Sequence, residues 1–142
     1  MSDDAGPNLY ELIVHDTVDA IIYADHEGKI RLWNAAAASL FGFPAATAIG
    51  TSLDLIIPDR LRASHWAGYH KAMETGHTRL NGRPTLTRAL HQDGRRLYVE
   101  MTFSVVHSPS GAVLGSVAVA RDVTEKRLKE TAALGAATGA PT

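Results

Sequence analysis

The clearest pattern along the chain is an alternation of apolar and polar side chains in the stretch 96–106. Every second position is apolar, namely Leu97, Val99, Met101, Phe103 and Val105. Successive side chains of a strand point to opposite faces, so the pattern predicts a long strand with one buried face. Turn residues bound further β-rich runs, which predict the other strands of an antiparallel sheet: Ala20–Ala24, Ile30–Trp33, Thr85–Leu90 and Val113–Ala120.

Helix signals fill the segment between the second and third of these strands. Asn34 is a good N-cap for a helix over 35–41, which Gly42 can end. Asp59 can cap a longer helix that runs through about residue 73 and stops at Gly76. Strands on both sides of a helical middle predict an α+β domain, with a five-stranded antiparallel sheet and short helices over one face.

Flanking segments complete the predicted domain organisation. Residues 1–6 are expected to be a disordered N-terminus, and Leu9, Leu12 and Ile13 have the spacing of a short amphipathic helix that opens a folded domain over 7–122. A C-terminal exit helix is expected over 123–131. The Ala/Gly/Thr-rich stretch 132–142 has little apolar bulk and is expected to be a disordered tail.

Composition narrows the function classes. The chain has 142 residues, 45% of them hydrophobic, which suits one core, and its net charge of -1 argues against a nucleic-acid-binding surface. No apolar stretch approaches the ~20 residues that span a bilayer, and the acidic start has no leader, so we expect a cytoplasmic protein without a membrane partner. No nucleophile–base constellation stands out, and we expect no enzyme activity.

Six short motifs, in this order, resemble those of PAS domains. They are 25–34, 37–43, Ile49-Gly50, Ile56-Ile57-Pro58, Gln92-Asp93-Gly94 and 120–125. Together they span about residues 9–130. The resemblance implies a PAS fold whose sheet has a concave face, closed by helices, that holds haem, flavin, another small ligand or nothing.

The segment 57–69 resembles the long helix of haem-binding PAS domains, in particular those of rhizobial oxygen-sensing kinases and of a bacterial carbon monoxide-sensing regulator. The resemblance implies that His65 is the proximal ligand of haem b. Tyr69, Ala72 and Met73 follow at helical spacing on the same face, and Gly68 is expected to leave room beside them. A neutral imidazole on a rigid helix, facing an apolar slot, is what haem ligation requires.

The same resemblance places Leu80, Met101 and Phe103 over the gas site. Met101 is either a sixth ligand to iron, since a thioether favours ferrous iron, or a core methionine of the alternating strand. Where the oxygen sensors carry an arginine that binds oxygen, this chain has Thr85, and Arg83 lies two residues before it.

Three cofactor states therefore remain open: haem b, FAD and none. The absence of cysteine excludes a thiol–flavin photocycle. Asn34 and Trp33 could meet a flavin, but the expected inward faces, with Leu86 and Leu90 beside the strand over 96–106, are apolar and favour a porphyrin. We expect a sensor of a diatomic gas (O2, CO or NO) or of redox state that signals by protein contact. It would act as a homodimer through its flanking helices and pass its signal to a partner kinase or regulator.

Overall fold

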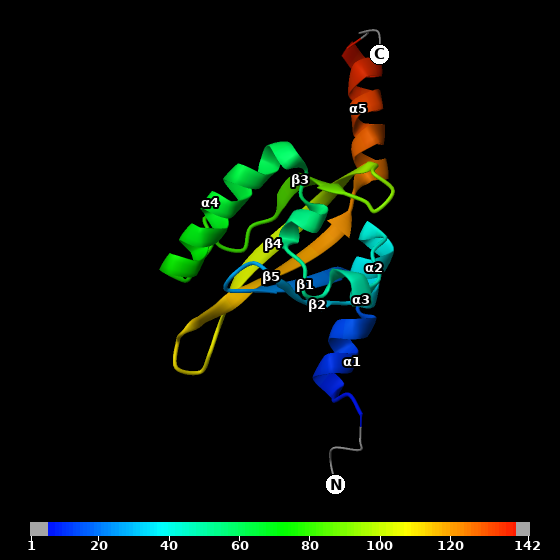
Figure 1. Ribbon diagram of the computed structural model, residues 1–142. Helices are drawn as coiled ribbons and strands as arrows, with labels where there is room; N and C mark the ends of the chain where they lie inside the picture. Colours follow the sequence, from blue (N-terminus) through cyan, green and yellow to red (C-terminus); the bar gives the residue numbers. More distant parts are fainter. Residues whose placement is uncertain (1–5, 139–142) are drawn as a thin grey trace.

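The computed structural model describes residues 6–138 and contains one five-stranded sheet (Figure 1). The strands are β1 (Ala20–Asp25), β2 (Ile30–Trp33), β3 (Thr85–Leu90), β4 (Arg96–His107) and β5 (Val113–Asp122). They lie in the order β2-β1-β5-β4-β3, and every neighbouring pair is antiparallel. The predicted antiparallel α+β architecture is confirmed.

Helices lie over one face of this sheet and extend from its ends. They are α1 (Leu9–Asp16), α2 (Ala35–Phe41), α3 (Ala45–Ala48), the short 3-10 helix η2 (Leu53–Ile56), α4 (Asp59–Thr75) and α5 (Thr124–Thr138). Asn34 caps α2 as predicted, because its side chain accepts a hydrogen bond from the Ala37 amide, and Gly42 ends the helix in the left-handed conformation. The N-cap of α4 is Pro58 rather than Asp59, which instead lies in the first turn, where a carboxylate favours the helix dipole.

The face of β4 that was predicted to be buried does face the helices. Met101 is 7% exposed and pairs with Ala120 of β5, which in turn pairs with Ala20 of β1. Directly paired residues share a face, so these side chains form one row across the inner face of the sheet. Phe103 lies in the next row, with Ala118 of β5 and Ile22 of β1.

The predicted facing of β3 is wrong. Leu86 pairs with Glu100 and is 49% exposed, so it faces away from the helices. Thr85 pairs with Met101, and Thr87 pairs with Val99, so the two threonines face inward. The tight turn at 91–95 sets this register, and a shift of one residue exchanges the two faces of a strand.

The flanking helices α1 and α5 project from the domain in opposite directions (Figure 1). None of the residues of α1 is buried. Helix α5 continues past residue 131 to Thr138, into the stretch expected to be a disordered tail, because alanines favour a helix even without a packing partner. Residues 1–5 and 139–142, which belong to the expected disordered termini, lie outside the described residues.

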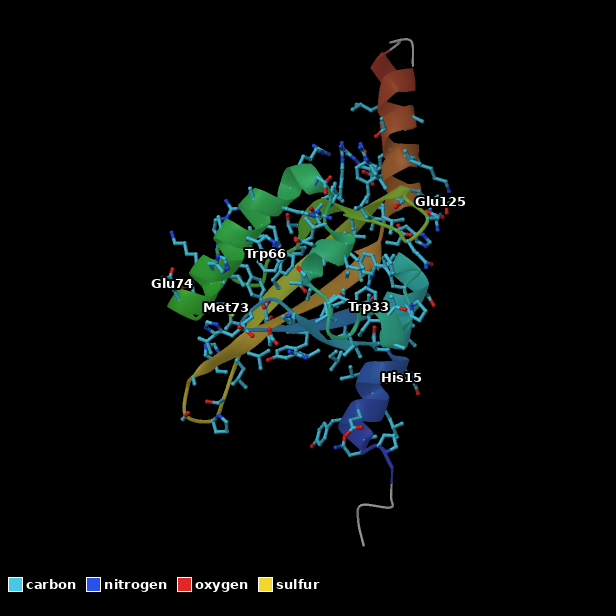
Figure 2. The ribbon with its side chains drawn as sticks, in the orientation of Figure 1. His15, Trp33, Trp66, Met73, Glu74 and Glu125 are labelled. Carbon is cyan, nitrogen blue, oxygen red and sulfur yellow. The ribbon has the colours of Figure 1, made fainter. Side chains whose placement is uncertain are left out.

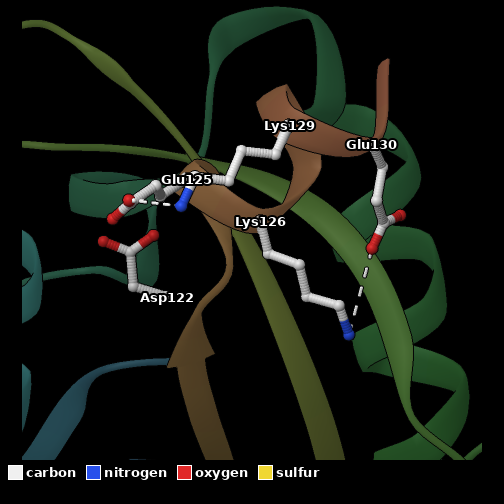
Figure 3. Close-up of a pocket in the computed structure, with 5 residues that line it drawn as sticks. All are labelled: Asp122, Glu125, Lys126, Lys129 and Glu130. Atoms are coloured by element: carbon white, nitrogen blue, oxygen red, sulfur yellow. Dashed lines mark ion pairs between the residues drawn. The ribbon is translucent and has the colours of Figure 1, made fainter. Parts of the chain in front are cut away.

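Two ion pairs at i, i+4 spacing support the first turns of α5. Lys129 lies 3.0 Å from Glu125, and Lys126 lies 4.0 Å from Glu130, beside an open hollow that Asp122 also lines (Figure 3). Exposed pairs of this kind each contribute about 0.3–0.5 kcal/mol. They favour the helix without giving it a ligand site.

Candidate functional site

Helix α4 is held on the inner face of the sheet by its two buried side chains, Tyr69 and Met73. The Tyr69 hydroxyl donates to backbone carbonyl oxygens at the end of β1, 3.2 Å from that of Ala24 and 2.5 Å from that of Asp25. Burial raises the pKa of Tyr69, so this phenol stays protonated and remains a donor. Met73 lies on the sheet side of α4, whereas Glu74 points away (Figure 2).

A second anchor joins α4 to the turn between β1 and β2. The Trp66 indole donates to the Asp54 carboxylate over 2.8 Å, and its ring covers Gly28 so closely that a Cβ at Gly28 would overlap it. Gly28 has φ +85°, which a turn tolerates best with glycine. A turn between the strands Ala20–Ala24 and Ile30–Trp33 was expected, but no local pattern in the sequence indicates that Trp66 packs on it.

His65 lies one turn before Tyr69 on the same side of α4. Its ring centroid is 4.7 Å from that of Trp66 and 5.8 Å from that of Tyr69. Burial lowers the pKa of His65, the nearby Asp54 carboxylate opposes this, and His70 adds to it, so the imidazole is held in its neutral form. Its Nδ1 is buried and has no hydrogen-bond partner within the described part of the chain.

The expected cofactor residues of the sheet lie in two groups. Met101 and Phe103 pack in a large core cluster with side chains of α2, whereas Tyr69 and Met73 pack with Ala24 in a smaller one. Val105 borders the smaller cluster and lies four residues after Met101 on β4. Four residues of a strand span about 13 Å, so the two groups are separated along β4. Leu80 is half-buried in the connection between α4 and β3.

Three further polar side chains near this region are exposed, although the ring centroid of His70 lies 6.0 Å from that of Trp66. His70 and His77 are exposed, as is Arg83, whose guanidinium donates to the Leu80 carbonyl 3.0 Å away. Gly68 is also exposed, and a Cβ there would meet nothing within 4 Å, so the expectation that Gly68 makes room for a cofactor finds no support in its surroundings. The hydrogen bond to the Leu80 carbonyl holds the Arg83 side chain within its own turn.

Both residues considered for a flavin make their hydrogen bonds within the protein. Asn34 is 3% exposed and accepts from the amides of Ile21 and Ala37. Its side-chain amide also donates to two carbonyl oxygens near α1. Trp33 is buried and donates to the Phe43 carbonyl. Asn34 thus ties α1, β1 and α2 together, a structural role beyond the predicted helix cap.

No group of three or more His, Asp or Glu side chains among residues 6–138 is arranged to hold a metal ion. Within the same residues, none of the helices is both long enough and apolar enough to cross a membrane. His65 remains, a half-buried residue whose buried Nδ1 is unpaired, and a ligand such as haem, which brings its own metal, could use its imidazole.

Comparisons with known proteins agree with this architecture. The chain is 28% identical over 113 residues to the sensor protein FixL of Bradyrhizobium diazoefficiens, covering 80% of this chain and 22% of FixL. It is 24% identical over 105 residues to the oxygen sensor protein DosP of Escherichia coli, covering 74% of this chain and 13% of DosP. The chain thus spans less than a quarter of the length of either relative.

A PAS domain from Colwellia psychrerythraea has a similar solved structure, with a TM-score of 0.72 and 22% identity, covering 82% of this chain and 95% of that one. Residues 8–123 match the family described as the PAS fold. PAS domains are generally sensory, non-catalytic modules that commonly dimerise. The chain belongs to the PAS family and is a PAS sensor domain.

Proposed function

We propose that this PAS domain binds haem b through His65 and senses a diatomic gas or redox state. The observation that carries the proposal is the buried Nδ1 of His65, the one buried side-chain nitrogen or oxygen among residues 6–135 without a hydrogen-bond partner. Buried polar groups are almost always paired, and an exception calls for an explanation. A metal-binding imidazole uses one ring nitrogen for the metal and the other for a hydrogen bond, so an unpaired Nδ1 leaves one of these roles open.

The surroundings of His65 support this proposal. The lowered pKa keeps the imidazole neutral, which is its ligating form, and Tyr69 and Met73 give an apolar wall on the same helix. Similarity to the oxygen sensor DosP supports a gas as the signal. Haem, when bound, supplies reversible gas binding and one-electron redox chemistry.

The sheet would provide the opposite wall. Phe103 and Leu80 would exclude water, and Met101 would offer a thioether as the sixth ligand. A displacement of Met101 would be transmitted along β4 to the C-terminal helix. Strand β4 also carries Tyr98, whose amide donates to the Thr124 hydroxyl at the start of α5 over 2.9 Å. A shift of β4 would therefore alter α5, through which a partner kinase or regulator could read the signal.

Haem titration of the purified apo-protein tests the role of His65. The unmodified protein should develop a Soret band, and His65→Ala should lose it or show weakly held haem. His70→Ala is the matched control, because His70 lies on the same helix but is exposed. Retention of the band in His65→Ala together with its loss in His70→Ala would refute the assignment of His65.

The role of Met101 has its own test. If the thioether ligates iron, the ferrous protein should give low-spin bands, and Met101→Leu should convert them to high-spin bands while haem stays bound. High-spin ferrous bands in the unmodified protein would contradict ligation by Met101 and leave the assignment of His65 standing.

A flavin such as FAD is the second candidate, because Thr85 and Thr87 place hydroxyl groups on an inner face that was expected to be apolar. Against it, Asn34 and Trp33 are already hydrogen-bonded within the protein. Absorption of the protein as purified separates the cases: a Soret band indicates haem, a double band near the visible edge indicates flavin, and neither indicates a ligand-free interaction module.

We also propose that the domain forms a homodimer through α1. Leu9, Leu12 and Ile13 are 66%, 46% and 56% exposed, although their spacing is that of a buried stripe. Sedimentation should show a dimer that Ile13→Glu dissociates. Leu86→Glu is the control, because Leu86 is a similarly exposed leucine on the edge strand β3. A monomer at high micromolar concentration would contradict this proposal.

A further inference from the structure

Two arginines from different elements lie over one tyrosine ring on the outer face of the sheet. Arg88 of β3 is the direct partner of Tyr98 on β4, and its guanidinium carbon lies 5.4 Å from the centroid of the Tyr98 ring. The guanidinium carbon of Arg127, on α5, lies 6.0 Å from the same centroid. Tyr98 alternates with the buried Leu97 and Val99, so its ring lies on the face opposite to the core.

The same tyrosine joins the sheet to the first turn of α5. Its amide donates to the Thr124 hydroxyl over 2.9 Å, and its carbonyl accepts from the amide of Val123 over 2.9 Å. Helix α5 therefore begins beside the start of β4 (Figure 1). A cation over an exposed aromatic face is held only weakly, so the two stacking contacts orient the guanidinium groups more than they stabilise the helix.

The positive charge of this cluster is not balanced by nearby acids. Within residues 6–135, neither Arg88 nor Arg127 forms an ion pair, and the exposed Arg96, on the same face of β4, forms none either. Glu100, an acid on that face, lies opposite Arg121 of β5. In a chain whose net charge is -1, three unbalanced arginines in one place make a local positive surface.

We propose that this arginine cluster, formed by Arg88, Arg96 and Arg127, is a docking site for an acidic segment of a partner protein. Guanidinium groups bind carboxylates through paired hydrogen bonds, and arginine clusters commonly recognise acidic peptide segments. Because Arg88 belongs to the sheet and Arg127 to α5, a segment that binds both also ties α5 to the sheet. The inference rests on the signalling role proposed above, in which a partner reads α5, and it requires no cofactor.

The same surface fits a nucleic acid poorly. Proteins that bind single strands stack the bases on free aromatic rings. The Tyr98 ring is already covered by the arginines of the cluster, and the net charge of -1 provides no wider field to attract phosphates. An acidic protein segment is therefore the occupant that the surface favours.

Binding of a fluorescein-labelled hexaglutamate peptide to the purified protein at low salt tests the proposal. Arg88→Ala and Arg127→Ala should each weaken binding about threefold to fivefold, as expected for the loss of an exposed ion pair. Arg95→Ala is the matched control, because Arg95 is an exposed arginine on the adjoining turn that pairs with Asp93 at 3.3 Å. It should leave the affinity unchanged. Tyr98→Phe, which keeps the ring, should also bind normally, whereas Tyr98→Leu should weaken binding about twofold because the guanidinium groups lose their orientation.

Hydrogen exchange gives a second readout that a merely structural role would not move. The bound peptide should slow exchange of the Arg127 amide, which donates to the Val123 carbonyl over 2.8 Å in the first turn of α5. This slowing should be absent in Arg88→Ala, because the peptide then no longer connects the sheet to the helix. Denaturant midpoints check that each variant is folded.

Three results would overturn the docking site: no binding of hexaglutamate, an equal loss of affinity in Arg95→Ala and Arg88→Ala, or tighter binding of an oligouridylate RNA or of phosphatidylglycerol vesicles than of the peptide. The second would indicate general attraction to positive charge, and the third would indicate a nucleic acid or a membrane as the occupant. Failure of the protein to bind haem would refute the haem function and leave these results unaffected.

Discussion

Replacing Gly28 by alanine tests the contact that fixes α4, and therefore His65, over the sheet. The added Cβ would overlap the Cη2 and Cζ3 atoms of Trp66. Trp66 cannot move aside freely, because its indole donates to Asp54 over 2.8 Å and packs edge-on against Tyr69 with ring centroids 5.4 Å apart. The substitution should therefore disturb both the turn and the helix anchor.

The expected loss in the free energy of unfolding has two parts. Gly28 has φ +85°, and an alanine in this left-handed region costs about 1–2 kcal/mol. Overpacking against the Trp66 ring adds about 1–3 kcal/mol. Gly94→Ala is the matched control, because Gly94 has φ +92° with nothing within 4 Å of an added Cβ, so it carries only the backbone cost.

Urea unfolding of Gly28→Ala, Trp66→Ala and the double variant measures the free energy of unfolding and separates the two parts. In the absence of the Trp66 ring, Gly28→Ala should cost no more than Gly94→Ala, which gives a coupling energy of about 1–3 kcal/mol. In the haem-loaded protein, Gly28→Ala should also alter the Soret band, since Trp66 is adjacent to His65. A cost for Gly28→Ala equal to that of Gly94→Ala in the unmodified background would refute a rigid Trp66 anchor.

Two further predictions concern the end of β1. Tyr69→Phe should lower the free energy of unfolding by about 1–3 kcal/mol, because the carbonyl oxygens of Ala24 and Asp25 lose their phenol donor. Tyr10→Phe is the control: Tyr10 is 79% exposed, so its loss should change the free energy of unfolding by less than about 0.5 kcal/mol. Equal effects of the two substitutions in urea unfolding would contradict the Tyr69 anchor. Burial, the largest single influence, raises the pKa of the Asp25 carboxyl, but hydrogen bonds from Arg31 and two backbone amides together lower it below its ordinary value. The Asp25 carboxylate thus stabilises the fold at pH values above its unfolded pKa of about 3.9, and this stabilisation is lost as the pH falls through the folded pKa. In urea titrations, the destabilisation by Asp25→Asn should therefore be largest near neutral pH and shrink towards pH 3. A destabilisation that does not change with pH would show that the charge is not the cause.

Local patterns in the sequence were sufficient for most of the fold. The alternation along β4, the Asn34 cap and the left-handed Gly42 depend on residues within a few positions of one another, and each is found where predicted. The helix face of Tyr69 and Met73 is equally local, because helical periodicity alone places two such residues on one side. These features need no knowledge of distant contacts.

The tertiary structure determined which side chains of the strands and of α4 face each other. Thr85–Leu90 has no strong alternation, so its facing depends on the register with β4, and this register turned the threonines inward and Leu86 outward. The contact of Trp66 with Gly28 joins residues far apart in the chain, and the unpaired Nδ1 of His65 is visible only once every neighbour is placed. By itself, the sequence determined the antiparallel α+β architecture and the histidine-bearing helix, because both follow from short-range periodicity and turn chemistry, and its resemblance to PAS motifs indicated the family. Only the folded structure decided which polar groups reach the inner face, because strand register and burial are collective properties of the whole sheet.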